Sequence, residues 1–226
     1  MIRRPLASVL FSLSMAAISS NALAADATTA NQGKAATAIF AGGCFWCSEA
    51  DFEKLPGVIG AESGYTAGSK SNPTYEQVSA GGTGHTESVR VSYDPSKLSY
   101  AQLVDYFWKH IDPTVKDKQF CDSGSQYRSG IYWQNAEERK IAEASREALL
   151  ASGKFKEIHT EVIAATAFYP AEEYHQDYYK EHPFRYKFYR FNSGRDQFLQ
   201  PVPERLAGAR AARRSEPETG ELPARG

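Results

Sequence analysis

Two cysteines, Cys44 and Cys47, lie three residues apart where a short apolar run ends and a helical pattern begins. The glycines before them, Gly42 and Gly43, let the chain turn sharply and let a ligand approach the backbone. The start of a helix stabilises a thiolate through its unpaired N–H groups and its dipole. A second thiol one helical turn further on can capture the oxidised form of the first. The spacing therefore indicates redox chemistry on a cysteine sulfur.

A thiolate at Cys44 has four uses to consider. Acyl transfer needs a base histidine, and none of the five histidines stands in a pattern that singles it out. A metal site needs about four ligands, and the chain lacks a second Cys or His pair. Disulfide exchange of the thioredoxin kind stays open, since it also places two cysteines at a helix start. Phe45 and Trp46 between the cysteines suit a small apolar ligand group better, which favours reduction of an oxidant in a shaped pocket.

Further polar side chains fall at the ends of predicted strands. Glu87 falls on the same side of the expected strand as Val89, Val91 and Tyr93, so its side chain should point toward the buried face. Burial would raise the pKa of its carboxyl group and make it a candidate acid near neutral pH. If the strand instead begins at Ser88, Glu87 is a solvated loop residue. Tyr75 lies in the preceding glycine-rich loop. Asp122 and Tyr127 lie before another strand and could reach the same pocket, or form only an ordinary turn and strand.

Periodicity gives the elements that must position these side chains. Ser99 is the expected N-cap of a helix that ends at His110, and Asn135 is the expected N-cap of a second helix. The expected strands are 37–41, 57–64, 87–93, 128–133 and 158–165, and the expected helices are 44–55, 99–110 and 136–151. This order contains a ferredoxin-like βαββαβ unit, so we predict an α+β fold with helices packed on one mixed sheet. From Phe168 a short helix and an irregular aromatic-rich coil should wrap the core.

The chain of 226 residues has a formal net charge of −1, which gives no reason to expect nucleic acid as a partner. Arg3 and Arg4 precede an apolar run that ends in an A-x-A site at Ala24, as in secretory signals. We therefore expect a signal peptide (1–24), a linker (25–36), a catalytic domain (37–200) and a disordered tail (201–226). The mature protein should be exported, periplasmic, free of the membrane and monomeric. No motif for a cofactor or a metal is present.

The motifs, taken together, resemble the A-type peptide-methionine sulfoxide reductases. The matches run in order along nearly the whole mature core, from about Thr37 to Arg185. They are Gly43-Cys44-Phe45-Trp46, Gly84-His85-Thr86-Glu87, Gly124-Ser125-Gln126-Tyr127-Arg128-Ser129 and Ala171-Glu172-Glu173-Tyr174-His175-Gln176-Asp177-Tyr178.

This resemblance implies reduction of the S epimer of methionine sulfoxide, free or in oxidised proteins, on a ferredoxin-like core. It implies that Cys44 attacks the sulfoxide sulfur and that Phe45 and Trp46 form the apolar wall for the terminal methyl group. Glu87 would donate a proton to the sulfoxide oxygen. The remaining polar roles, also implied, are hydrogen bonds to that oxygen from Tyr75 and Tyr127 and support from Asp122.

The chain departs from the best-known pattern of this family at the second thiol. Many relatives have glycine at the position of Cys47 and resolving cysteines in a C-terminal tail, whereas the tail from Pro201 has none. Cys47 is therefore the expected resolving thiol, with Cys121 as the competitor. Recycling would use an external thioredoxin-like dithiol and no bound cofactor. The alternative function is that of a general thiol-disulfide oxidoreductase.

Overall fold

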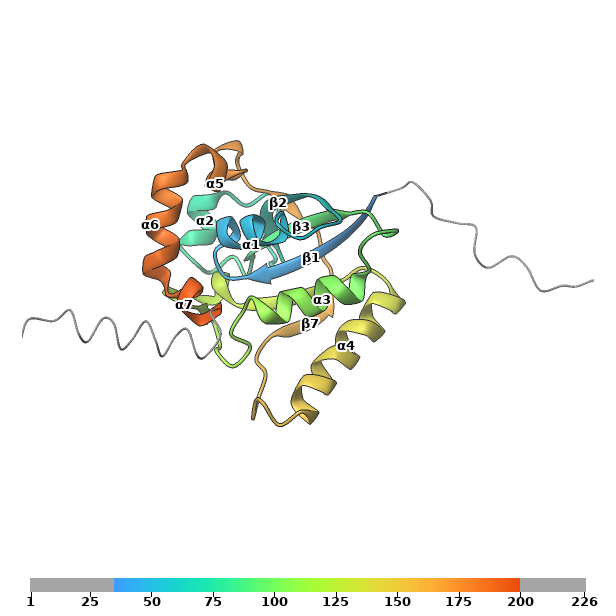
Figure 1. Cartoon of the computed structure of the whole chain (residues 1–226). Coiled ribbons are helices and arrows are strands. Elements are labelled where there is room, and N and C mark those ends of the chain that lie inside the picture. The colour runs from blue at the N-terminus through green and yellow to red at the C-terminus, as the bar shows by residue number, and fades with distance from the viewer. Residues whose placement is uncertain (1–34, 200–226) are drawn as a thin grey trace, which may run out of the picture. The chain divides into compact units, whose positions relative to one another are not determined.

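The computed structural model describes residues 35–199 (Figure 1). The expected signal peptide, nearly all of the linker and the expected tail lie outside the described residues. The strands are β1 Ala36–Gly42, β2 Val58–Thr66, β3 Thr86–Tyr93, β4 Lys118–Gln119, β5 Asp122–Ser123, β6 Ser129–Trp133, β7 Glu161–Ala164 and β8 Tyr169–Pro170. The helices are α1 Phe45–Phe52, α2 Tyr75–Ser79, α3 Tyr100–Lys109, α4 Ala136–Ala151, α5 Tyr178–Glu181, α6 Pro183–Ser193 and α7 Arg195–Leu199, with short 3₁₀ turns η1 Ser125–Tyr127 and η2 Glu173–His175.

Six strands form one mixed sheet in the order β7-β6-β1-β3-β2-β8. The four central strands pair antiparallel, and β7 adds in parallel to β6. The connections through α1 and α3 make the βαββαβ unit, so the predicted fold class is confirmed. β1 lies at the centre of the sheet, and its carboxyl end leads directly into the two cysteines.

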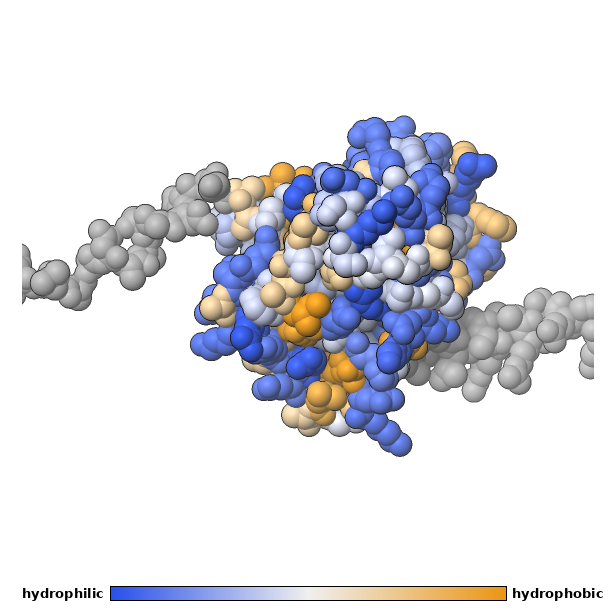
Figure 2. Space-filling view, turned by 180° about the vertical axis from the view of Figure 1, so that it is seen from behind, coloured by the Kyte–Doolittle hydropathy of each residue, from blue (hydrophilic) through white to orange (hydrophobic). Residues whose placement is uncertain are grey.

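The main core lies between the sheet and the helices on one of its faces. Phe40 of β1 stacks against Phe52 of α1 at 4.9 Å between ring centroids and against Phe107 of α3 at 5.2 Å. Both helices thus cover the same face of the central strand. The other face carries a smaller cluster of Ile39, Ala41 and Tyr132. Figure 2 shows the molecule from behind, where apolar side chains form separate patches among polar ones.

The predicted caps fix the starts of two helices. The Ser99 side chain accepts from the Gln102 N–H at α3, and the Asn135 side chain accepts from the Glu138 N–H at α4. The long loop before β3 contains a helix that was not predicted, α2, which begins with a capping box at Thr74 and Gln77.

The C-terminal segment is more helical than the predicted short helix and coil. Helix α6 has eleven residues, Pro183–Ser193, and is followed by Gly194 in the left-handed conformation. Proline at the first turn and glycine after the last are helix signals that the aromatic composition obscured. The last helices lie at the edge of the fold beside α1 and α2 (Figure 1). None of the helices in the described range is long and apolar enough to cross a membrane.

Candidate active site

Cys44 occupies the junction between β1 and α1 as the N-cap of the helix. Its carbonyl accepts hydrogen bonds from the N–H groups of Cys47 and Ser48, at 3.1 and 3.2 Å. Gly43 before it has φ of +83°, and a Cβ there would lie 2.5 Å from Cβ of Gln119. Only glycine fits this turn, which places Cys44 at the start of the helix, where its side chain makes no capping hydrogen bond.

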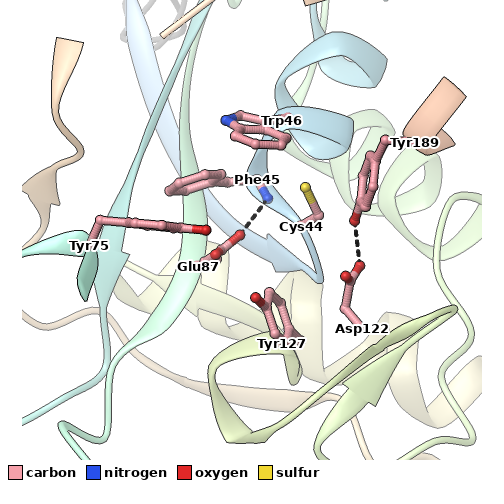
Figure 3. A pocket seen from close by; sticks show the side chains of 8 residues that line it. All are labelled: Cys44, Phe45, Trp46, Tyr75, Glu87, Asp122, Tyr127 and Tyr189. Carbon is pink, nitrogen blue, oxygen red and sulfur yellow. Dashed lines mark hydrogen bonds between the residues drawn. The ribbon is translucent and has the colours of Figure 1, made fainter. Parts of the chain in front are cut away.

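The Cys44 side chain opens into a cavity of about 130 Å³ (Figure 3). The structure brings seven residues singled out by the sequence together around it and adds Tyr189. The seven come from the start of α1, from α2, β3 and β5 and from the turn η1, and they are Cys44, Phe45, Trp46, Tyr75, Glu87, Asp122 and Tyr127. Segments that are far apart in the chain thus meet at one thiol.

Glu87 points inward from β3 and is only 2% exposed. The strand begins at Thr86, so the alternative of a solvated loop residue is wrong. One carboxyl oxygen, Oε2, accepts the Phe45 N–H at 3.0 Å. Burial raises the pKa of Glu87 to about 8, although the Phe45 N–H opposes this shift. Near neutral pH Glu87 is therefore mostly a neutral carboxylic acid beside the thiol.

Two hydroxyl groups face the same space as Glu87. Figure 3 shows the Tyr75 and Tyr127 side chains pointing toward the Glu87 carboxyl. Burial, reinforced by the nearby Glu87 carboxyl, raises the pKa of Tyr75 to about 12 and that of Tyr127 above its usual range. Both phenols thus stay protonated and can donate hydrogen bonds to an oxygen atom bound between them.

Tyr189 was missed by sequence reasoning. It projects from α6 toward the other side of Cys44, where its hydroxyl donates to Asp122 Oδ2 at 2.6 Å. The segment 169–191 is rich in aromatic residues, but nothing in its spacing distinguishes Tyr189 from its neighbours. The contact gives Asp122 a defined partner and closes the pocket with the C-terminal helix.

The two aromatics that follow Cys44 are held by stacking. Phe45 stacks with Tyr75 at 6.4 Å between ring centroids. Trp46 lies flat on Tyr178 at 3.7 Å with an interplanar angle of 5°, and its Nε1 donates to His175 Nδ1 at 3.1 Å. These contacts fix an apolar wall beside the thiol, of the kind that would seat a small apolar group.

All three thiols are free. Cys44 and Cys47 are buried in one cluster, whereas Cys121 is exposed and its Sγ lies 3.7 Å from Asp122 Oδ1. Cys47 is therefore the thiol that packs with Cys44. Cys121 lies outside their buried cluster.

A group of three carboxylates, Glu49, Glu53 and Asp177, has oxygens within 4.8 Å of one another. Lys180 Nζ lies 2.7 Å from Glu53 and 2.6 Å from Asp177. The lysine supplies the cation that this group needs, so within residues 35–199 the cluster is better described as an ion-pair network than as a metal centre.

The same architecture and sequence recur in known proteins. Residues 36–206 match the family described as peptide methionine sulfoxide reductase. The peptide methionine sulfoxide reductase MsrA of Bacillus licheniformis is 51% identical over 164 residues, which cover 72% of this chain and 91% of that protein. The MsrA of Ligilactobacillus salivarius is 53% identical over 163 residues, covering 72% of this chain and 94% of the relative.

Two solved structures are similar as well. Reduced Mxr1 from Saccharomyces cerevisiae has a TM-score of 0.63 and 30% identity, covering 68% of this chain and 88% of that one. Methionine sulfoxide reductase A of Corynebacterium diphtheriae has a TM-score of 0.60 and 35% identity, covering 67% of this chain and 77% of that one.

Proposed function

The chain belongs to the peptide methionine sulfoxide reductase family, and we propose that it reduces the S epimer of methionine sulfoxide with Cys44 as the nucleophile. The observation that carries this mechanism is the neutral, buried Glu87 carboxyl in the same cavity as the thiol. A sulfoxide oxygen leaves sulfur only when it is protonated. A thiol and a carboxylic acid side by side supply both requirements of the reaction.

In the first step, Cys44 attacks the sulfoxide sulfur while Glu87 transfers its proton to the oxygen. The oxygen passes from the substrate sulfur to Cys44, methionine leaves and Cys44 becomes a sulfenic acid. Two electrons thereby move from the cysteine sulfur to the substrate sulfur. Negative charge builds on oxygen in the transition state, where the Tyr75 and Tyr127 hydroxyls would donate hydrogen bonds.

The pocket also explains a preference for one epimer. The Phe45 and Trp46 wall would hold the terminal methyl group, and Glu87 with the two tyrosines would hold the oxygen. The positions of two substituents on the chiral sulfur are then fixed. The third substituent, the remainder of the methionine side chain, has only one direction left. For the R epimer, attack by Cys44 would require oxygen and methyl to exchange places, which puts a polar atom against the aromatic wall.

A second candidate is general thiol-disulfide exchange through Cys44 and Cys47. Thiol-disulfide exchange has no use for a protonated carboxyl group or for an aromatic wall beside the attacking thiol. Reduction of a sulfoxide uses both, and both line the cavity at Cys44. The surroundings of the thiol therefore favour the sulfoxide.

The proposed reaction is tested by a single turnover without any reductant. The protein, reduced and freed of thiols, is mixed with excess methionine S-sulfoxide, and methionine and free thiols are counted. About one methionine per chain and the loss of two thiols are expected, since one sulfoxide oxidises one thiol pair. Thiol loss without methionine would contradict the mechanism.

For the return to the reduced state, Cys47 is the proposed partner of Cys44, because the two thiols share one buried cluster. Cys47 would attack the sulfenic sulfur, forming the disulfide and releasing water. An external dithiol of the thioredoxin type would then open that disulfide, without a bound cofactor. Oxidised proteins and free methionine sulfoxide are the proposed substrates.

Replacing Cys47 by serine should keep the yield of the first turnover, at whatever rate it then runs, and stop the following turnovers when a thioredoxin-type reductant is used. About one methionine per chain is expected, together with a sulfenic acid that dimedone traps on Cys44. Steady turnover by Cys47→Ser would move the resolving role to Cys121. The double variant Cys47→Ser/Cys121→Ser then decides whether Cys121 acts at all.

We also propose export to the periplasm, on the basis of the charged and apolar N-terminal segment and its site at Ala24. Mass spectrometry of the protein from a periplasmic extract should give a chain that begins at Ala25. An intact N-terminus in the cytoplasmic fraction would contradict export.

A further inference from the structure

Two buried arginines lie beside Asp51 on α1, the helix that also carries Cys47. Cys47 and Asp51 are four residues apart on α1 and so lie on one side of the helix. Arg190 Nη1 lies 2.8 Å from Asp51 Oδ1, and Arg195 Nη1 lies 3.8 Å from Asp51 Oδ2. The C-terminal helices α6 and α7 thus bring two positive charges to the helix that carries the second thiol.

Both guanidinium groups are fixed by further contacts. Arg190 Nη1 donates to the Tyr186 hydroxyl at 2.9 Å. Arg195 donates to the carbonyls of Gly42 and His110, so it is tied to the end of β1 and to the end of α3. Only 7% of Arg190 and 2% of Arg195 is exposed. Arg195 cannot swing into solvent without losing its bond to the end of β1, and Arg190 cannot do so without losing its ion pair with Asp51.

The two arginines are not paired equally. Arg190 has two close acidic partners, Asp51 at 2.8 Å and Asp196 at 2.6 Å. Arg195 lies 3.8 Å from Asp51 Oδ2, and its hydrogen bonds go to backbone carbonyls. The positive charge of Arg195 is therefore the less compensated of the two, and a thiolate on the same helix as Asp51 would be stabilised by it.

The two thiols differ in the charged groups that lie closest to them. The cavity side of Cys44 has the Glu87 carboxyl and the Asp122–Tyr189 pair. The titratable and charged groups around Cys47 come from α1, β3, α6 and α7, and they are Cys44, Asp51, Glu87, Tyr186, Tyr189, Arg190 and Arg195.

The direction of the thiol pKa values agrees with this arrangement. Burial raises the pKa of Cys44, and the neighbouring Cys47 raises it further. A hydrogen bond from the Cys44 thiol lowers the pKa of Cys47 against the effect of burial, and the positive charges of Arg195 and Arg190 lower it further.

We propose that Arg190 and Arg195 are positioning residues that make Cys47, rather than Cys44, the thiolate of the reduced pair. The proposal rests on the reductase function and assigns Cys47 a second role within it. Before turnover, the Cys47 thiolate accepts a hydrogen bond from the Cys44 thiol. It is then the base that takes the Cys44 proton as Cys44 attacks the sulfoxide.

The protons and electrons balance over both steps. In the first, the Cys44 S–H bond breaks, its proton goes to Cys47, and Glu87 gives its proton to the sulfoxide oxygen. In the second, Cys47 attacks the Cys44 sulfenic sulfur, the S–S bond forms and the S–O bond breaks. The proton on Cys47 leaves with that oxygen as water, and the Glu87 carboxylate regains a proton from solvent.

The test titrates Cys47 alone, in the full chain with Cys44→Ser and Cys121→Ser, by the ultraviolet absorbance of the thiolate. Arg190→Gln should raise the pKa of Cys47, and Arg190→Lys should restore it. Asp51→Asn removes the opposing charge and should lower it. Arg185→Gln, on the exposed side of the same helix, is the matched control and should not move it.

Opposite shifts from Arg190→Gln and Asp51→Asn support the proposal, because a merely structural role would disturb Cys47 in the same direction in both. Shifts of the same sign, or no shift in correctly folded variants, would overturn it. With Cys44 restored, Arg190→Gln should slow disulfide formation after one turnover at neutral pH by about tenfold, in proportion to the lost thiolate. The titration needs no sulfoxide, so its outcome is separate from that of the reductase function.

Discussion

The Cys44→Ser variant is expected to reduce methionine S-sulfoxide at least about 10⁴-fold more slowly than the wild type. A serine hydroxyl ionises far less readily than a thiol, and its oxygen cannot take the sulfoxide oxygen to form a sulfenic acid. The variant should fold, since the two side chains are similar in size and that of Cys44 packs without a disulfide. Methionine formed per minute under excess dithiothreitol measures the effect.

The same chemical change at Cys121 provides the comparison. Cys121 is exposed and does not line the cavity, so Cys121→Ser should carry out its first turnover at the wild-type rate. Substantial turnover by Cys44→Ser, in protein whose melting temperature equals that of the wild type, would remove Cys44 from the mechanism.

The Glu87→Gln variant should lose about 10²–10⁴-fold in the rate of the first chemical step. Glutamine keeps an oxygen that can accept the Phe45 N–H, but it has no acidic proton for the sulfoxide oxygen. Single-turnover measurements isolate this step, because they do not depend on the recycling of the disulfide.

The pKa of Glu87 also predicts the direction in which the rate changes with pH. A carboxyl group with a pKa of about 8 is mostly protonated at neutral pH and loses its proton as the pH rises. The wild-type rate of sulfoxide reduction should therefore fall above about pH 8, and Glu87→Gln should lack that decline.

Glu49 offers a matched control for this substitution. Its carboxyl is also buried, with a pKa raised to about 7 by burial, but its oxygens accept from Ser63 Oγ and the Asp177 N–H outside the cavity. Glu49→Gln should keep the rate of the first step within about threefold of the wild type. A loss at Glu49 equal to that at Glu87 would mean that a buried carboxyl is needed for folding rather than for proton transfer.

Local rules predicted much of the scaffold. Alternating apolar residues set the inward direction of Glu87, and Ser99 and Asn135 mark helix starts through bonds to N–H groups three residues on. These features depend on a few neighbouring residues, so they can be read from the chain. The pair of cysteines at the start of α1 is local in the same sense.

Features that depend on packing between distant segments were not predictable in this way. Tyr189 reaches Cys44 only because α6 folds back onto α1, a placement set by the buried contacts of Tyr186 and Arg190. The charge around Cys47 has the same origin, since Arg190 and Arg195 look like ordinary surface cations in the sequence. The sequence pattern indicates helices and strands, but it does not indicate which side chains of distant helices pack against Cys44 and Cys47.

The most direct measurement incubates the protein with dithiothreitol and either the S or the R epimer of methionine sulfoxide, and follows methionine. Methionine from the S epimer, with little or none from the R epimer, is the result expected from a thiol, an acid and an apolar wall in fixed positions. Insulin disulfide reduction is measured in parallel with the same preparation. No methionine from either epimer, together with rapid reduction of insulin, would contradict the reductase mechanism.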